Sequence, residues 1–294
     1  ITESQKLHLL SSFLHETGRW CETTDSAMHF TVSSIHTTMK SPPFAAAASA
    51  LASRQLDAKA ARNQPRQTTL ELYQHTLRLL ICRRPDDVDE SILATCTLLC
   101  VYEMMAAEVG EWRRHLQGCA ELLRAKGWNG SSPGIVKSCF WAFARIDVWA
   151  AFITRQRTLI PTESWVETDS VRTIAEMGDL DDYCNLAILF FARIVNLMAS
   201  LHEPARREVA AEVRVLWDKL QEWYARRPEK ARPLMRLDRD GTNPFPRIMY
   251  SQSSPKEFAA EKIAILKQLA RFEQETGWKT LERAAQLRRM WGFG

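Results

Sequence analysis

The chain has 294 residues, of which 46% are hydrophobic and 25% are charged, and its formal net charge is +4. This composition excludes a low-complexity or largely disordered protein, and the length suffices for a domain with a substantial core. The small net charge is weak evidence for a surface that binds nucleic acid directly, so a solvated amphipathic surface is the simpler interpretation.

Apolar residues recur at helical spacing along nearly the whole chain, and no alternating run predicts a strand. Stripes at 7–14 and 70–80 indicate early helices, and Ser41-Pro42-Pro43 is a favourable start for an alanine-rich helix over 44–61. Later helices are expected at 111–126, 135–157, 182–201, 204–226, 257–275 and 279–290. The sequence thus predicts an all-α fold, a single large domain over 1–294 with roughly ten to twelve helices and no sheet.

Two boundaries stand out in the pattern. Gly127 is expected to end the helix over 111–126 with a Schellman-type cap, in which Trp128 makes the hydrophobic contact. Prolines concentrate after Arg227, so residues 227–260 are expected to form a long loop.

The most apolar stretches indicate core helices rather than membrane spans. They cover 92–107, 135–153 and 184–201, and each is short or interrupted by charge, as at Glu103 and Arg193. We therefore expect no membrane partner. The seven cysteines include no Cys-x-x-Cys pair, and most lie in apolar helical patterns, which indicates a reducing compartment.

The helix over 135–157 is apolar almost all round, yet it carries Arg145 and Asp147. These two side chains face different ways, and an unpaired buried charge costs several kcal/mol, so each needs its own partner. We expect Glu103 for Arg145, and Arg113 or Arg114 for Asp147. A polar network that fixes helix packing is the favoured interpretation, and contact with a ligand is the alternative.

The acidic run from Asp86 to Glu90 has two interpretations. It follows Pro85, so its carboxylates suit the start of a helix. Aspartate-rich runs also bind magnesium diphosphate in all-α terpene synthases, but that chemistry needs a second metal-binding cluster, and none is visible in the sequence. An enzyme of this type stays an alternative. The chain shows no nucleophile elbow, phosphate loop or His-Glu-x-x-His, so no catalytic or metal-binding residue is assigned.

The order of several short motifs is more informative than any one of them. A leucine-rich segment ends in Tyr102-Glu103, and Trp112 and the run His115-Leu116-Gln117-Gly118 follow. An aromatic helix with Trp141, Arg145 and Asp147 comes next, then a Phe-Pro loop at 243–246 and closing segments over 272–291. This order resembles the fungal-specific transcription factor domain, the regulatory domain of fungal Zn2Cys6 binuclear-cluster transcription factors. The resemblance makes eight residues family-signature positions: Tyr102, Glu103, Trp112, His115, Gly118, Trp141, Arg145 and Asp147.

The resemblance implies a nuclear regulator of RNA polymerase II transcription without enzymatic activity. In that family a zinc-cysteine module that precedes the helical domain reads DNA, so zinc and DNA contacts are expected outside this chain. Transcriptional co-regulators and a second copy of the chain are the expected protein partners. A scaffold without its own DNA reader is the remaining alternative.

Some relatives in this family bind a small hydrophobic effector in the helical domain, and this chain has aromatic residues suited to such a pocket. We expect its lining at Trp141, Trp149, Phe152, Phe190 and Phe191. One departure from the family pattern bears on this expectation. Family members carry additional helices after the Phe-Pro loop, and nothing comparable stands between 250 and 262, where a segment is expected to be missing.

Overall fold

The computed structural model describes residues 1–60, 65–83, 89–106, 109–200, 209–232, 235–237, 247–249 and 285. Over these residues the chain forms ten α-helices, several short 3₁₀ or π turns and one two-stranded ladder. The all-α prediction is confirmed. The predicted helix over 257–275, the Phe-Pro loop at 243–246 and the expected gap between 250 and 262 lie outside the described residues. So does the predicted helix over 279–290, apart from residue 285.

The ladder corrects the expectation that no sheet is present. Strands β1 (Met235–Leu237) and β2 (Arg247–Met249) pair antiparallel, with Arg236 opposite Ile248. They lie within the segment predicted as a long loop. Three residues per strand are too few for an alternating pattern to show in the sequence.

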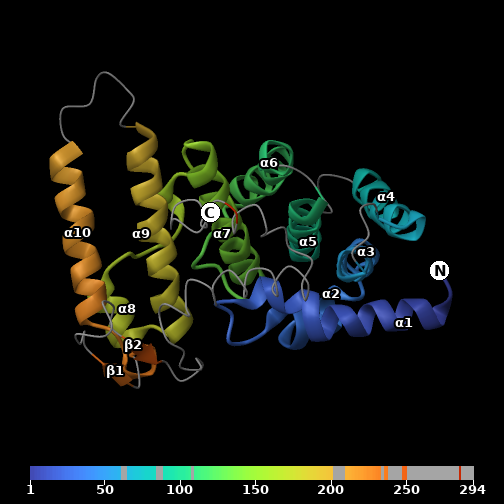
Figure 1. The fold of residues 1–294 in the computed structure, drawn as a ribbon, viewed down its shortest axis with the longest axis horizontal. Coiled ribbons are helices and arrows are strands. Elements are labelled where there is room, and N and C mark those ends of the chain that lie inside the picture. Colours follow the sequence, from blue (N-terminus) through green and yellow to red (C-terminus); the bar gives the residue numbers. More distant parts are fainter. Residues whose placement is uncertain are drawn as a thin grey trace.

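The N-terminal part packs beneath the helical body (Figure 1). Helix α1 (Glu3–Ser12) starts at a capping box made by Thr2 and Gln5, and it continues into a π turn and a 3₁₀ turn (Phe13–Thr17 and Gly18–Glu22). A further π turn (His29–Ser33) and the short helix α2 (Ile35–Thr38) lead to α3 (Pro42–Lys59). Phe13 packs edge-on against Phe44 at 5.9 Å between ring centroids, which joins the first turns to α3.

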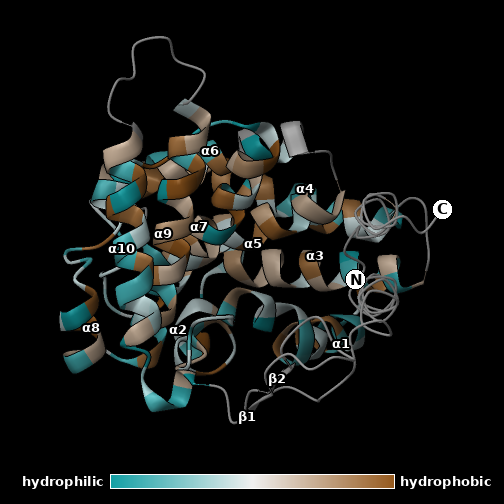
Figure 2. Cartoon of the chain, turned by 60° about the vertical axis from the view of Figure 1, so that its left-hand side comes forward, coloured by the Kyte–Doolittle hydropathy of each residue, from teal (hydrophilic) through white to brown (hydrophobic). Residues whose placement is uncertain are grey.

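The central helices follow one another through the core. They are α3, α4 (Gln67–Ile81), α5 (Glu90–Ala106), α6 (Val109–Lys126) and α7 (Ile135–Thr154). Helix α3 packs on α4 and α5, and α5 packs on α6 and α7. Apolar residues gather where these helices face one another (Figure 2). The predicted cap of α6 is confirmed, because Gly127 adopts a φ of +65° and the Trp128 amide donates to the Leu123 carbonyl at 2.9 Å.

The C-terminal described part consists of α8 (Val171–Met177), α9 (Leu180–Ser200) and α10 (Val209–Ala225). Helix α9 lies between α7 and α10 (Figure 1), and the stacked rings of Tyr183 and Trp223 join it to α10 at 5.5 Å. Among the described helices, α9 alone has the length and hydropathy of a membrane span. Half of its most apolar 18-residue stretch is buried, as in a core helix.

Candidate functional site

Tyr102 and Glu103 join α5 to α4. The Tyr102 ring stacks on the Tyr73 ring with centroids 4.6 Å apart, and the Tyr73 hydroxyl donates to the Glu103 carboxylate. Burial and the neighbouring Glu103 raise the pKa of Tyr73, so this hydroxyl stays protonated and remains a donor. Glu103 is therefore committed to α4, and the prediction that it pairs with Arg145 is wrong.

Arg145 binds the N-terminal segment instead. Its guanidinium donates to the Thr24 hydroxyl at 2.7 Å and to the Cys21 carbonyl at 3.1 Å. Thr24 in turn donates to the side-chain oxygen of Asn185 at 2.6 Å, which extends the contact to α9. Burial lowers the pKa of Arg145, although the nearby Asp25 favours its charged form. The sequence could not indicate these partners of Arg145, because neither a backbone carbonyl nor a hydroxyl carries the opposite charge by which a partner was sought.

Asp147 holds the segment that follows α7. Its carboxylate accepts a hydrogen bond from the Leu159 amide at 2.6 Å and lies 3.9 Å from the Arg113 guanidinium. Arg113 also donates to Thr154 at 2.7 Å and to the Arg157 carbonyl. The predicted pairing of Asp147 with Arg113 is therefore confirmed. Burial raises the pKa of Asp147 to about 6, although the amide and Arg113 favour its charged form.

Trp112 and Trp141 are buried anchors of the core. The Trp141 indole donates to the Gly130 carbonyl at 3.0 Å and meets Trp165 edge-on, with ring centroids 6.0 Å apart. A Cβ atom on Gly130 would lie only 2.7 Å from the Trp141 ring, so glycine permits this approach.

The remaining two signature positions lie on α6. Gly118 is exposed, and a Cβ atom there would meet nothing within 4 Å. The side chain of His115 lies outside the described part of the structure. The other described signature residues thus lie in packing or hydrogen-bond contacts, whereas Gly118 does not.

The five residues expected to line a hydrophobic pocket are divided between core and surface. Trp141 and Phe190 are buried, whereas Trp149, Phe152 and Phe191 are 41%, 36% and 39% exposed. The Phe152 ring centroid lies 6.3 Å from that of Trp149 and 5.9 Å from that of Phe191. These three side chains form a surface feature across α7 and α9, which we call the aromatic ridge.

A Ser-His-Asp cluster that the sequence did not reveal lies between the N-terminal segment and α7. The His29 Nδ1 atom is 2.7 Å from an Asp25 carboxylate oxygen and 3.1 Å from the Ser138 hydroxyl. A catalytic relay needs the serine and the aspartate on opposite ring nitrogens, and here both contact the same one. The cluster therefore holds the N-terminal segment on α7 and does not form a nucleophile with its base.

The acidic run is described only at its end, since Asp86 and Asp87 lie outside the described residues. The Asp89 carboxylate accepts hydrogen bonds from the Ser91 amide at 2.9 Å and from the Ser91 hydroxyl at 2.6 Å, as a helix cap does. In the described part of the chain, no three His, Cys, Asp or Glu side chains gather as metal ligands.

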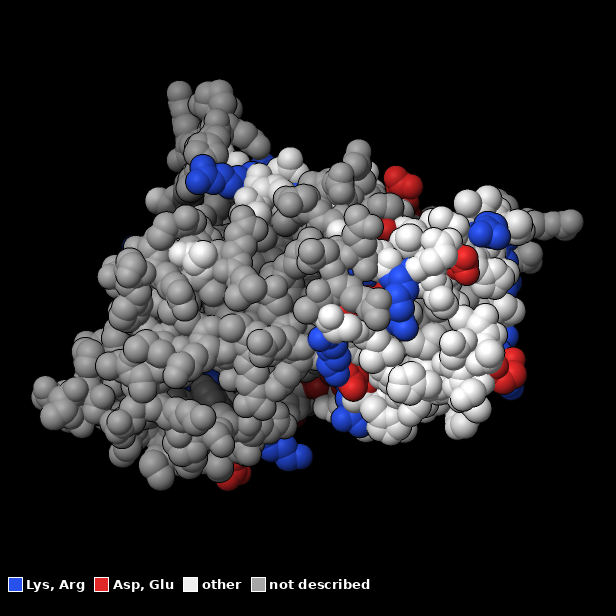
Figure 3. Space-filling view, turned by 45° about the vertical axis from the view of Figure 1, so that its right-hand side comes forward, with Lys and Arg blue, Asp and Glu red and all other residues white. Residues whose placement is uncertain are grey.

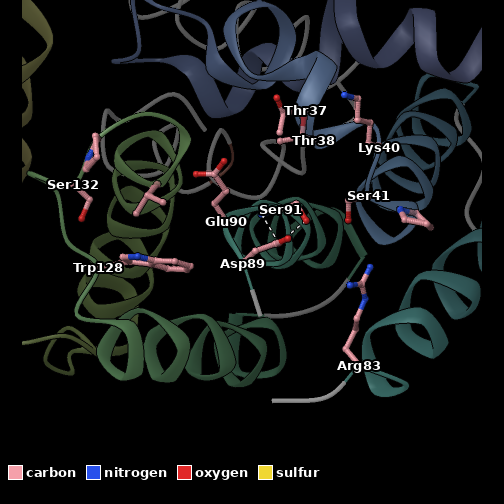
Figure 4. Close-up of a pocket in the computed structure, with 13 residues that line it drawn as sticks. Thr37, Thr38, Lys40, Ser41, Arg83, Asp89, Glu90, Ser91, Trp128 and Ser132 are labelled. Carbon is pink, nitrogen blue, oxygen red and sulfur yellow. Dashed lines mark hydrogen bonds between the residues drawn. The ribbon is translucent and has the colours of Figure 1, made fainter. Parts of the chain in front are cut away.

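Two hollows in the described surface are large enough for a small molecule. One, of about 720 Å³, opens between the starts of α3, α5 and α7 and includes Arg83 and Trp128 (Figure 4). The other, of about 520 Å³, lies between residues 157–163, α9 and α10. Neither is lined by any of the five residues expected to bind a hydrophobic effector.

Comparison with known proteins shows the family of the chain. A family model described as the fungal-specific transcription factor domain matches residues 9–273. The chain belongs to this family. Membership of this family gives the chain a role in the regulation of transcription. Proteins of the family are in general nuclear and non-enzymatic.

One curated relative is the transcription activator AMTR1 of Alternaria alternata, which is 26% identical over 149 residues. The match covers 37% of this chain and 19% of the relative, so the chain spans about a fifth of that protein. No solved structure matches the chain.

Proposed function

We propose that this domain controls the activity of a fungal sequence-specific RNA polymerase II transcription factor through contacts with transcriptional co-regulators in the nucleus. Membership of the family over residues 9–273 supports the regulatory role. DNA reading and zinc binding are assigned to a module outside this chain. On the face shown in Figure 3, the described Lys and Arg side chains lie among Asp and Glu and form no uniform basic surface.

The aromatic ridge is the observation that carries the proposal of protein contacts. Burying Phe152, Phe191 and the adjoining Trp149 in a partner would remove large apolar surfaces from water. Exposed aromatic side chains are enriched among the residues that dominate binding energy at protein interfaces. The part-buried hydrogen bonds of Arg145 and Asp147 hold the same helix that presents the ridge, so the partner meets a preformed surface.

The test is to tether residues 1–294 to an unrelated DNA-binding module in a fungal nucleus and to measure reporter output. The proposal predicts output that differs several-fold from that of the module alone. Output equal to that of the module alone in every growth condition would contradict it. Sedimentation of the purified chain separates co-regulators from a second copy as the ridge's partner, because a ridge-dependent dimer would assign the ridge to self-association.

A further inference from the structure

Helix α10 lies at the edge of the molecule, beside α9 (Figure 1). Trp223 faces α9, because its ring stacks on the Tyr183 ring and its indole donates to the Tyr183 carbonyl at 3.0 Å. Ala211 and Val215 line the hollow of about 520 Å³ next to α9. One side of α10 therefore packs on α9, and an adjoining side lines this hollow.

The side of α10 away from this hollow carries an apolar stripe. Residues two positions apart on an α-helix point about 200° apart, so Val213 and Trp217 point away from the hollow that Val215 lines. Val213, Trp217 and Tyr224 are 49%, 60% and 47% exposed, and the partly buried Leu220 lies between the last two. Exposed aromatic side chains are enriched at protein interfaces, so this stripe is a candidate contact surface.

The spacing of the stripe indicates what kind of partner fits it. Its apolar residues alternate at intervals of three and four, the repeat by which paired helices pack, and they are Ala210, Val213, Trp217, Leu220 and Tyr224. The stripe extends seven residues to either side of Trp217 and reads nearly the same from both ends. A second α10 that runs antiparallel therefore places its Trp217 against the first Trp217 and its Leu220 against the first Val213. A two-fold contact of this kind needs only one surface, which both copies present.

Two polar side chains beside the stripe fit the same arrangement. Gln221 is two residues from Trp223, so it points away from α9, and Arg214 lies two turns earlier on the same side. Both are exposed and make no hydrogen bond or ion pair with any described residue. Arg214 stands three residues before Trp217 and Gln221 four residues after it. An antiparallel second copy therefore brings its Gln221 side-chain oxygen to the Arg214 guanidinium.

The size of this contact indicates a weak dimer. The exposed parts of the stripe and of its two polar neighbours amount to roughly 500 Å² per copy, so two copies bury roughly 1,000 Å² together. Interfaces of this size belong to weak or transient complexes.

We propose that two copies of this chain associate through the apolar stripe of α10, with the two helices antiparallel. The inference goes beyond the proposed function, because it assigns self-association to α10 and leaves the aromatic ridge to co-regulators. The reporter test of the ridge and the measurement of this dimer therefore succeed or fail separately.

The experiment is sedimentation equilibrium of the 1–294 chain over a range of concentrations. The chain should dimerise with a Kd of about 10–100 μM. Trp217→Ser should raise this Kd about ten-fold or more, because it removes the centre of the contact. Val215→Ser is the matched control, since Val215 is 56% exposed on the same helix but lines the hollow, and it should leave the Kd unchanged.

Substitution of Gln221 tests the antiparallel arrangement and keeps the stripe intact. Gln221→Glu should lower the Kd about three- to ten-fold, because each new carboxylate meets Arg214 of the second copy. Gln221→Lys should raise the Kd by a similar factor, and adding Arg214→Glu to it should restore dimerisation. Gln117→Glu, at an exposed position on α6, makes the same change in net charge and should have no effect.

Thermal unfolding of each variant checks that it folds, and the Gln221 variants decide the matter if Trp217→Ser does not. A chain that stays monomeric at about 1 mM, well above the expected Kd, would overturn the proposal. So would an equal effect of Val215→Ser and Trp217→Ser, a weaker dimer with Gln221→Glu, or a dimer that depends on Phe152 and Phe191 instead of Trp217.

Discussion

The carboxylate of Asp147 on α7 and the guanidinium of Arg113 on α6 lie 3.9 Å apart in the core, with the Leu159 amide 2.6 Å from the same carboxylate. The Asp147 carboxylate thus joins α6, α7 and the segment that follows α7. Burial still disfavours its charge, and the pKa of Asp147 rises to about 6.

This raised pKa predicts a pH dependence of stability. The folded state binds the Asp147 proton more tightly than the unfolded chain, where the pKa has its ordinary value of 3.8. The stability that the tighter binding of this proton gives to the folded state is therefore fully present below about pH 4. It is lost as the pH rises through about 6. Relative to Asp147→Asn, the wild-type free energy of unfolding should fall by roughly 1–3 kcal/mol between pH 4 and pH 7.

Urea unfolding of both proteins at a series of pH values measures that difference. Asp218→Asn, at an exposed position on α10, is the matched control and should follow the wild-type profile. A difference between wild type and Asp147→Asn that does not vary with pH, or that grows in favour of the wild type as pH rises, would contradict the assignment.

Arg145 should be a major determinant of stability. Arg145→Met keeps the aliphatic stem but leaves the Thr24 hydroxyl and the Cys21 carbonyl without their donor. The expected loss in the free energy of unfolding is about 2–4 kcal/mol, measured by urea unfolding. Arg78→Met, at an exposed position on α4, should change it by less than about 0.5 kcal/mol. Equal effects of the two substitutions would show that the buried contacts contribute nothing.

Two glycines should respond to alanine with opposite signs. In Gly130→Ala the new Cβ would lie 2.7 Å from the Trp141 ring and 2.8 Å from the Trp165 carbonyl oxygen, so the free energy of unfolding should drop by about 1–3 kcal/mol. Gly118 is helical and has open space around it, so Gly118→Ala should raise stability by about 0.5–1 kcal/mol. Thermal denaturation of the pair checks both signs, and a stabilised Gly130→Ala would show that the two tryptophans give way.

The sequence predicted the helices well where their ends carry local signals, as at Gly127. It also predicted Arg113 or Arg114 as the partner of Asp147, since a buried charge calls for an opposite one, and the structure has Arg113 there. It failed for Arg145, because the acceptors are a carbonyl and a hydroxyl on a segment placed only by tertiary packing.

The expected aromatic pocket shows a second limit of the sequence. Phe190 and Phe191 are consecutive on α9, and consecutive helical residues face different directions, so one is buried and the other is exposed. The hollow at Ser41, Asp89 and Trp128 could not be predicted either, because it is assembled from the ends of helices distant in sequence.

The central claim is that the domain regulates transcription through the aromatic ridge. The most direct test is reporter output from the tethered chain with Phe152→Ala and Phe191→Ala together. The control carries Ile81→Ala and Met177→Ala, which also remove exposed apolar side chains, on α4 and α8. With both proteins folded and equally abundant, the ridge variant should lose most of the chain's effect on output and the control should keep it. An unchanged ridge variant, or an equal loss in the control, would contradict the account.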